Sequence, residues 1–287
     1  MIEDVDRLRA PFERWLAARW PDASDVRIGD VQAPKSGFSA QTLILPVEGE
    51  RAGAPFRDKI VLRLETPEPA IYPQQAPGLD CEVEIQFRAM QAIAHAAAAP
   101  LAPLVGFEPD PSVLGTPFYA MGFVDGDVPV EDPIYTKQGF FVDAKPEQRA
   151  RLVEEGIRAM ASLHALDWRE AGFDWLVPAG AAPTIARQLD LWERYARREL
   201  RERVHPGIDR ALAWLHANAP ARTNPPALSW GDSRPGNIIW RDFRPAALTD
   251  FENVAVAPPE LDLGWWLMFD RWSHETYGQE RLPGEPT

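Results

Sequence analysis

The sequence has very little of what builds disulfide-linked or zinc-bound folds. One of its 287 residues is a cysteine, Cys81, which excludes an internal disulfide framework and a Cys/His zinc site. The five histidines are scattered without the spacing that metal ligands show. A single cysteine also fits the reducing conditions of a cytoplasm.

Positive charge is scarce as well. The sequence contains 30 Lys and Arg residues and 43 Asp and Glu residues, which gives a formal net charge of −13. Such a surface repels nucleic-acid phosphates and anionic membranes, so we expect neither as a partner. The first residues, "MIEDVDRLRAPFERWL", lack the apolar stretch of a secretory signal, and no apolar run is long enough to span a bilayer. We therefore expect a soluble, cytoplasmic protein, and the sequence does not indicate its oligomeric state.

The first part of the chain predicts a sheet with one inserted helix. An amphipathic segment at 3–20 predicts a helix that ends at Pro21. Strand-like pieces follow at 25–31, 41–47 and 59–65, and then a helix around 81–98. The segments "LVGFEP" and "PFYAMGFV" complete an antiparallel pair. We therefore expect a five-stranded sheet with a helix after its third strand.

The second part is predicted to be mainly helical. Apolar periodicity predicts helices at 146–166, 184–203 and 207–219. A hairpin follows, formed by "NIIWRDF", the turn "RP" and "AALTDFE". We therefore predict an α+β chain with an N-terminal lobe at 1–125, a hinge near Gly126 and a C-terminal lobe at 126–287.

One loop in the second part carries a chemical pattern. In "LSWGDSRPGNIIW", residues 228–240, Asp232 and Asn237 stand in the spacing D-x-x-x-x-N, and Asp250 follows in "LTDFE". Asp and Asn are also ordinary turn formers, so the loop alone is weak evidence. Phosphoryl transfer, however, needs a carboxylate to accept a hydroxyl proton and hard oxygen ligands to hold Mg²⁺. A sheet lobe, a helical lobe and a hairpin bearing Asp-Phe favour this chemical interpretation.

Together, "WGDSRPGNIIW" and "LTDFENVAVAPPELDLGWW" resemble the aminoglycoside phosphotransferase-like family, whose loop usually reads H-G-D-x-x-x-x-N. The resemblance extends to "PFYAMGFVDG" and "AMASLHALDW" and covers most of the chain. It implies a bilobal protein-kinase-like fold, ATP and Mg²⁺ as cofactors, and a small-molecule hydroxyl as phosphate acceptor. By the same resemblance, Asp232 would be the catalytic base, and Asn237 and Asp250 would be the Mg²⁺ ligands.

The resemblance also implies a set of nucleotide-binding residues in the first lobe. Arg63 stands where the family places a lysine, and Arg binds phosphate well. The family's helix position for its acidic partner is matched by Gln86, so the partner would be Glu84, with Glu82 or no acid as the alternatives. Phosphate would meet the loop "KSGFSA" through Ser36 and Ser39. Adenine would meet the main chain of four consecutive residues: Met121, Gly122, Phe123 and Val124.

The chain departs from the family pattern in ways that leave alternatives open. Trp230 replaces the usual His, and the phosphate-covering loop contains only Gly37. Trp230, Arg63 and the few residues that follow "DLGWW" suggest a nucleotide-binding regulatory module as an alternative to an enzyme. A protein kinase is disfavoured because no H-R-D segment or Gly-rich loop is present. Arg234 lies inside the loop, where it can meet a phosphate, an acidic acceptor or a neighbouring acid, and Asp262 is expected to anchor the loop.

Overall fold

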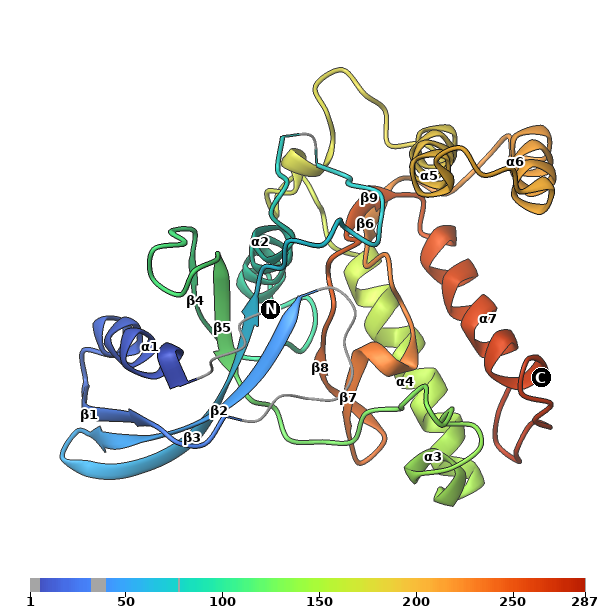
Figure 1. The fold of residues 1–287 in the computed structure, drawn as a ribbon. Helices are drawn as coiled ribbons and strands as arrows, with labels where there is room; N and C mark the ends of the chain where they lie inside the picture. Colours follow the sequence, from blue (N-terminus) through green and yellow to red (C-terminus); the bar gives the residue numbers. More distant parts are fainter. Residues whose placement is uncertain (1–5, 32–39, 77, 287) are drawn as a thin grey trace. The chain divides into compact units, whose positions relative to one another are not determined.

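Figure 1 shows the computed structural model of the chain, which describes residues 6–31, 40–76 and 78–286. The chain forms two compact units whose segments alternate along the sequence. The first unit comprises residues 1–71, 79–91 and 102–124, and the second comprises residues 72–78, 92–101 and 125–287. The division into lobes at 1–125 and 126–287 stays a prediction, since two short segments before residue 125 group with the second unit.

The first unit is built on a five-stranded antiparallel sheet with the order β1-β2-β3-β5-β4. Its strands are β1 (Ala23–Ile28), β2 (Gln41–Arg51), β3 (Ala54–Leu64), β4 (Leu104–Glu108) and β5 (Phe118–Gly122). Strands β2 and β3 pair without interruption from Gln41↔Leu64 to Arg51↔Ala54. The predicted five-stranded sheet is therefore confirmed.

Helix α1 (Asp6–Arg19) supplies the apolar side chains that cover one face of this sheet. Phe12 and Leu16 are buried among residues of the three central strands, including Ile60, Leu62 and Leu64 of β3. Those three residues alternate along β3, so Val61 and Arg63 point to the opposite face. The alternation of the sequence predicted this division of the strand.

Helix α2 (Glu82–His95) follows the third strand, as predicted, and Glu65 caps its first turn. The carboxylate of Glu65 accepts hydrogen bonds from the amides of Glu82, at 3.2 Å, and Val83, at 2.9 Å. A carboxylate at this end of a helix satisfies free amides and complements the helix dipole. Glu65 thereby fixes the start of α2 relative to the end of β3.

The second unit consists mainly of helices. They are α3 (Phe140–Asp143), α4 (Pro146–His164), α5 (Ile185–Leu200), α6 (Pro206–Ala217) and α7 (Glu260–Glu275), with 3₁₀ turns η1 (Asp174–Leu176) and η2 (Pro235–Asn237). The predicted helices correspond to α4, α5 and α6. The apolar pattern of the sequence did not predict α7, which brings Asp262 and Trp265 to the candidate site.

Two short antiparallel ladders frame the loop that bears the sequence motif. One pairs β6 (Ala227–Ser229) with β9 (Ala255–Ala257), and the other pairs β7 (Ile238–Arg241) with β8 (Arg244–Leu248). The predicted turn "RP" is wrong, because Asp242 and Phe243 form the turn with φ values of 52° and 59°. A two-residue turn with positive φ matches the twist of a hairpin, and Asp tolerates that conformation.

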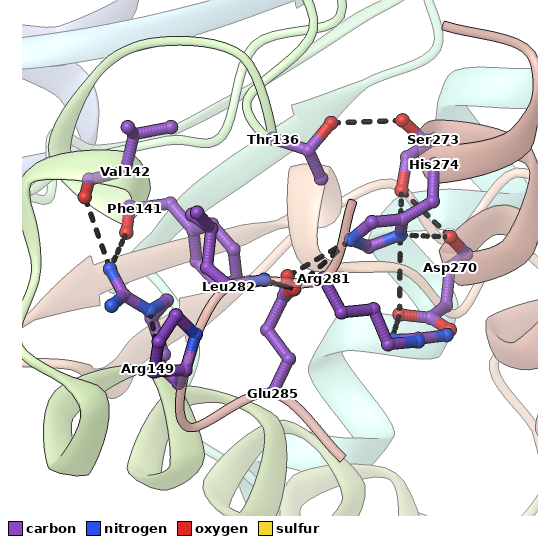
Figure 2. Close-up of polar contacts among 11 residues, drawn as sticks. Thr136, Phe141, Val142, Arg149, Asp270, Ser273, His274, Arg281, Leu282 and Glu285 are labelled. Atoms are coloured by element: carbon purple, nitrogen blue, oxygen red, sulfur yellow. Dashed lines mark hydrogen bonds and ion pairs between the residues drawn. The ribbon is translucent and has the colours of Figure 1, made fainter. Parts of the chain in front are cut away.

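The C-terminal residues return to the start of the helical region (Figure 2). Arg149 of α4 is buried and donates hydrogen bonds to the carbonyls of Phe141, at 3.2 Å, and Val142, at 3.0 Å. Its Nε atom donates to the Pro283 carbonyl at 2.8 Å. Glu285 accepts a hydrogen bond from His274 of α7 at 3.1 Å. The tail therefore joins the end of α7 to the corner between α3 and α4.

Within the ranges that the structure describes, no helix is both long enough and apolar enough to cross a membrane.

Candidate active site

The candidate catalytic loop follows β6, and Asp262 in the first turn of α7 holds it in place. The Asp262 carboxylate accepts hydrogen bonds from the amides of Trp230 and Gly231 and from the hydroxyl of Ser229, each at 2.8 Å. His164 of α4 contacts the same carboxylate through Nε2 at 2.8 Å. Asp262 is 1% exposed, so water does not compete for these bonds. The prediction that Asp262 anchors this loop is confirmed.

Gly231 lets the loop pass close to the chain at residue 253. Its φ is +89°, and a Cβ atom there would lie 2.0 Å from the carbonyl oxygen of Asn253. The Asn253 side chain in turn donates a hydrogen bond to the Gly231 carbonyl at 3.1 Å. Only glycine meets both requirements, so this position fixes the approach of the chain to Asp232.

Trp230 connects the loop to the far arm of the hairpin. Its ring is fully buried beside Phe251, and its Nε1 atom donates a hydrogen bond to the Thr249 carbonyl at 2.9 Å. Thr249 donates to the Asn237 carbonyl from its amide at 2.9 Å and from its hydroxyl at 3.0 Å. The residue that departs from the usual family pattern thus stabilises the segment just before Asp250.

Asn237 and Asp250 present oxygen atoms of the kind that Mg²⁺ prefers. The Asn237 side-chain nitrogen donates to the Asp232 carbonyl at 2.9 Å, so the amide oxygen is the atom available for a cation. Asp250 has a φ of 64°, a conformation that is uncommon for residues with a Cβ and that clusters at functional sites. In the described ranges no set of three or more His, Cys, Asp or Glu side chains forms a metal cage. An amide oxygen and a carboxylate are hard ligands of the kind found around a cation that also takes ligands from phosphate and water.

Asp232 is almost completely enclosed. It is 1% exposed, and its Oδ1 atom accepts hydrogen bonds from Trp265 Nε1 at 2.7 Å and from Arg234 Nε at 3.0 Å. Burial and the negative charge of Asp250 raise the pKa of Asp232 to about 6. Arg234 also forms an ion pair with Glu131. Of the three partners considered for Arg234, the structure therefore shows the neighbouring acids. The enclosure produces a carboxylate that is more basic than usual, which suits proton acceptance.

Tyr72 is part of the site, although the sequence pattern did not single it out. Its ring packs edge-on against Trp192 of α5 and Trp265 of α7, with 6.3 Å between centroids in each pair. Burial and the carboxylate of Asp232 raise the pKa of its hydroxyl. Tyr72 lies in the proline-rich connection between β3 and α2, where no periodic pattern predicts which surface it meets.

The candidate nucleotide residues lie in the first unit. Arg63 donates a hydrogen bond from Nη1 to the Thr42 hydroxyl at 3.2 Å, on the sheet face opposite α1. Glu84 forms an ion pair with Arg88 at 3.7 Å, one turn along α2. A pairing of Arg63 with Glu84 or Glu82 stays a prediction. Ser36 and Ser39 lie outside the described residues.

The candidate adenine segment continues β5. The amide of Gly122 donates to the Pro103 carbonyl at 2.7 Å, and the amide of Phe123 donates to the Lys59 carbonyl at 2.9 Å. These two amides are therefore already used within the first unit. Recognition of a base by the main chain of residues 121–124 stays a prediction.

Comparison with known proteins places the chain in a family. The sequence profile described as the phosphotransferase enzyme family matches residues 30–284. The chain belongs to this family. The match includes the loop with Asp232 and Asn237 and the hairpin end with Asp250, and it confirms the family resemblance seen in the sequence.

Solved structures of family members share the fold of this phosphotransferase family member. A candidate aminoglycoside phosphotransferase from Ralstonia eutropha is 22% identical, with a TM-score of 0.65 over 91% of this chain and 69% of that one. The GDP and kanamycin complex of APH(2″)-IIIa is 18% identical, with a TM-score of 0.57 over 94% of this chain and 83% of that one. These similarities confirm the predicted α+β, kinase-like fold.

A curated relative is much longer than this family member. Acyl-CoA dehydrogenase family member 10 of Mus musculus is 25% identical over 185 residues, which are 64% of this chain and 16% of that protein. The chain thus spans about one sixth of the length of that relative. The similarity concerns only part of a larger protein.

Proposed function

We propose that the chain transfers the γ-phosphoryl group of ATP, with Mg²⁺, to a hydroxyl of a small molecule. The observation that carries this proposal is the enclosed Asp232, which is joined to Asn237 by one hydrogen bond and whose pKa is raised in part by the charge of Asp250. Asp232 would orient the acceptor hydroxyl and accept its proton. Family membership supports phosphoryl transfer, and the nucleotide complexes of structural neighbours support a nucleotide donor.

Asn237 and Asp250 would hold the metal ion in this proposal. Asn237 offers a neutral amide oxygen whose orientation is fixed by its bond to the Asp232 carbonyl, and Asp250 offers an anionic one. When bound, Mg²⁺ neutralises charge on the phosphates of the nucleotide. Trp265 and Arg234 hold the Asp232 carboxylate in one orientation, which supports in-line attack by the acceptor.

Two acceptor classes are favoured by the relatives. The names of structural neighbours refer to aminoglycosides, and the acidic charge of this chain is compatible with a cationic acceptor. The name of the curated relative refers to acyl-CoA, which makes a hydroxylated acyl-CoA thioester the second class. Both offer an alcohol to Asp232.

The test is transfer of label from γ-labelled ATP, with Mg²⁺, to a panel of aminoglycosides, hydroxyacyl-CoA thioesters and other hydroxylated metabolites. The expected result is a phosphorylated product from one class, with a gain of one phosphate in its mass. Binding of nucleotide without transfer to any acceptor would favour the regulatory module instead.

Asp250→Asn is expected to weaken binding of Mg²⁺-ATP at least about tenfold. Mutation of residues that only hydrogen-bond to a metal ligand already lowers metal affinity by about tenfold or more, and loss of the ligand's own charge should cost at least as much. The neutral amide keeps the size of the side chain and tolerates positive φ, so the loss reports the missing charge. Calorimetric titration of ATP with and without Mg²⁺ measures it. Asp242→Asn is the matched control, because Asp242 is an exposed aspartate with φ 52° in the same hairpin. Equal Mg²⁺ dependence in the two variants would place the metal elsewhere.

Arg63→Ala is expected to raise the dissociation constant of ATP about tenfold or more, the effect of losing a charge-assisted hydrogen bond to phosphate. Arg63→Lys should recover part of the affinity because it keeps the charge. Arg57→Ala is the control, since Arg57 lies on the same strand and pairs with Glu48 at the surface. Unchanged ATP affinity in Arg63→Ala would remove this residue from the nucleotide site.

A further inference from the structure

Helix α7 carries a stripe of exposed residues along one side. Its members are spaced as residues on one side of a helix are, and we call them the α7 stripe: Glu260, Leu263, Gly264, Leu267, Met268 and Arg271. The three large apolar members, Leu263, Leu267 and Met268, are 42%, 55% and 44% exposed. Single exposed apolar side chains are ordinary, but a cluster of them on one helix indicates an interaction surface.

Gly264 leaves a gap in the middle of the α7 stripe. A Cβ atom added there would have no atom of the described residues within 4 Å. Glycine weakens a helix compared with alanine, and no contact inside the described part of the chain requires its small size here. The gap can therefore receive a side chain from outside the chain, which lets another helix approach closely.

The α7 stripe is complementary to itself when its direction is reversed. Its central line has the alternating four- and three-residue spacing of a helix that packs on a partner helix, and it reads Glu260, Gly264, Leu267 and Arg271. A two-fold axis level with the midpoint between residues 265 and 266 would bring Glu260 of one copy opposite Arg271 of the other. It would also bring Leu267 of each copy opposite the gap at Gly264 of the other. Such reciprocal contacts are what a two-fold interface requires.

The charges at the two ends of the line determine the direction of the pairing. Parallel helices in register would place like charges opposite each other, whereas antiparallel helices place Glu260 opposite Arg271 at both ends. In its own chain Arg271 contacts Glu275 at 2.7 Å, and Glu260 accepts a hydrogen bond from the side chain of Asn224 at 2.8 Å. Both are exposed contacts of the kind that contribute little to stability, so they do not prevent a second copy from pairing with these charges.

We propose that two copies of this chain associate through the α7 stripe, with the two helices antiparallel about a two-fold axis. Leu263 and Met268 lie on the two flanks of the central line, so the same contact would cover them. Asp262 and Trp265 lie on the other side of α7, where they contact the candidate catalytic loop. The association therefore leaves the candidate site uncovered, and it does not depend on the proposed function.

Sedimentation velocity over a wide range of protein concentration measures this association. Each chain carries a formal net charge of −13, so the buffer should contain about 0.15 M salt, which screens long-range repulsion beyond about 8 Å. The natural protein should approach twice the monomer mass at the highest concentrations. A protein that stays monomeric throughout would overturn the proposal and leave the α7 stripe to a different partner.

Two substitutions within the α7 stripe test the contact at its centre. Leu267→Lys should raise the dissociation constant of the dimer at least about tenfold, because an apolar side chain that is buried on association becomes a charged one. Gly264→Gln should do the same by filling the gap, while the Tm of the monomer stays equal or rises because glutamine favours a helix. Leu215→Lys is the matched control, since Leu215 of α6 is a leucine with a similar exposure of 41%. Equal association in all three variants would contradict the proposal.

Charge reversal tests the antiparallel register. Glu260→Arg and Arg271→Glu, each alone, would place like charges opposite each other at both ends of the contact, and each should weaken the dimer about tenfold. The double variant restores opposite charges with their signs exchanged, so it should recover most of the association. A double variant that is as weak as the single variants, or weaker, would overturn the proposed register.

Discussion

Asp232→Asn is expected to lower the turnover of phosphoryl transfer about 10²–10⁴-fold while leaving ATP affinity nearly unchanged. The amide keeps the acceptor oxygen for the bonds from Trp265 and Arg234 but cannot take a proton from the acceptor hydroxyl. Single-turnover transfer from labelled ATP measures the loss, and calorimetry measures ATP binding. Asp242→Asn, the exposed aspartate of the hairpin turn, is the control. Near-normal turnover would remove Asp232 from the role of base.

The same substitution should stabilise the metal-free and nucleotide-free protein at neutral pH. Folding raises the pKa of Asp232 from its ordinary value to about 6, so the ionised form is disfavoured in the folded state. The resulting loss of stability is absent below pH ~4, where both states are protonated, and complete above pH ~6. A pKa difference of about two corresponds to at most about 3 kcal/mol, partly offset because Arg234 loses a charged partner.

Thermal unfolding at several pH values tests this. Asp232→Asn should have a higher Tm than the natural protein at pH 8, and the difference should shrink towards pH 4. If the difference in Tm between the variant and the natural protein were smaller at pH 8 than at pH 4, the raised pKa would be contradicted. The predicted combination of lost turnover and gained stability is typical of a residue that is retained for chemistry.

Asp262→Ala is expected to lower the free energy of unfolding by about 3–5 kcal/mol, because the donors around a buried carboxylate lose their partner together. Those donors are the amides of Trp230 and Gly231, the hydroxyl of Ser229 and the ring of His164. Burial means that water cannot simply replace the carboxylate. Turnover should also fall, since the backbone on both sides of Gly231 would no longer be held.

Urea denaturation followed by circular dichroism measures the stability of this variant. Glu260→Ala is the matched control, because Glu260 lies in the same first turn of α7 but is exposed and contacts Asn224. It should change the free energy of unfolding by less than about 1 kcal/mol. A similar small effect in Asp262→Ala would mean that the loop is held by its other contacts.

The sequence predicted the parts of this protein that depend on local pattern. Alternation in "KIVLRLE" separated the buried Ile60, Leu62 and Leu64 from Arg63, and the structure shows the same division. The spacing of Asp232 and Asn237 indicated that the loop would bring them together, and one hydrogen bond joins these two residues. Such features need only the chain's own geometry over a few residues.

Features that depend on distant segments were not predictable from pattern. Tyr72 and Gln75 meet side chains more than 100 residues away, and nothing in a proline-rich stretch indicates which ones. Helix α7 was missed because apolar side chains lie on its exposed side too, as with Leu263 and Leu267, so no clean stripe marks it. The turn of the hairpin was misplaced because Asp242 and Phe243 adopt positive φ without a glycine.

The return of the C-terminal tail has a consequence for how the second unit unfolds. Arg149, at the beginning of the helical region, bonds to residue 283, and His274, near the end of α7, bonds to Glu285 (Figure 2). Residues 283–285 therefore link the beginning of the helical region to its end. Segments that are bonded to each other in this way do not open independently. The amides of α7 and of the α3–α4 corner should therefore lose their protection against hydrogen exchange at the same denaturant concentration, as one cooperative group.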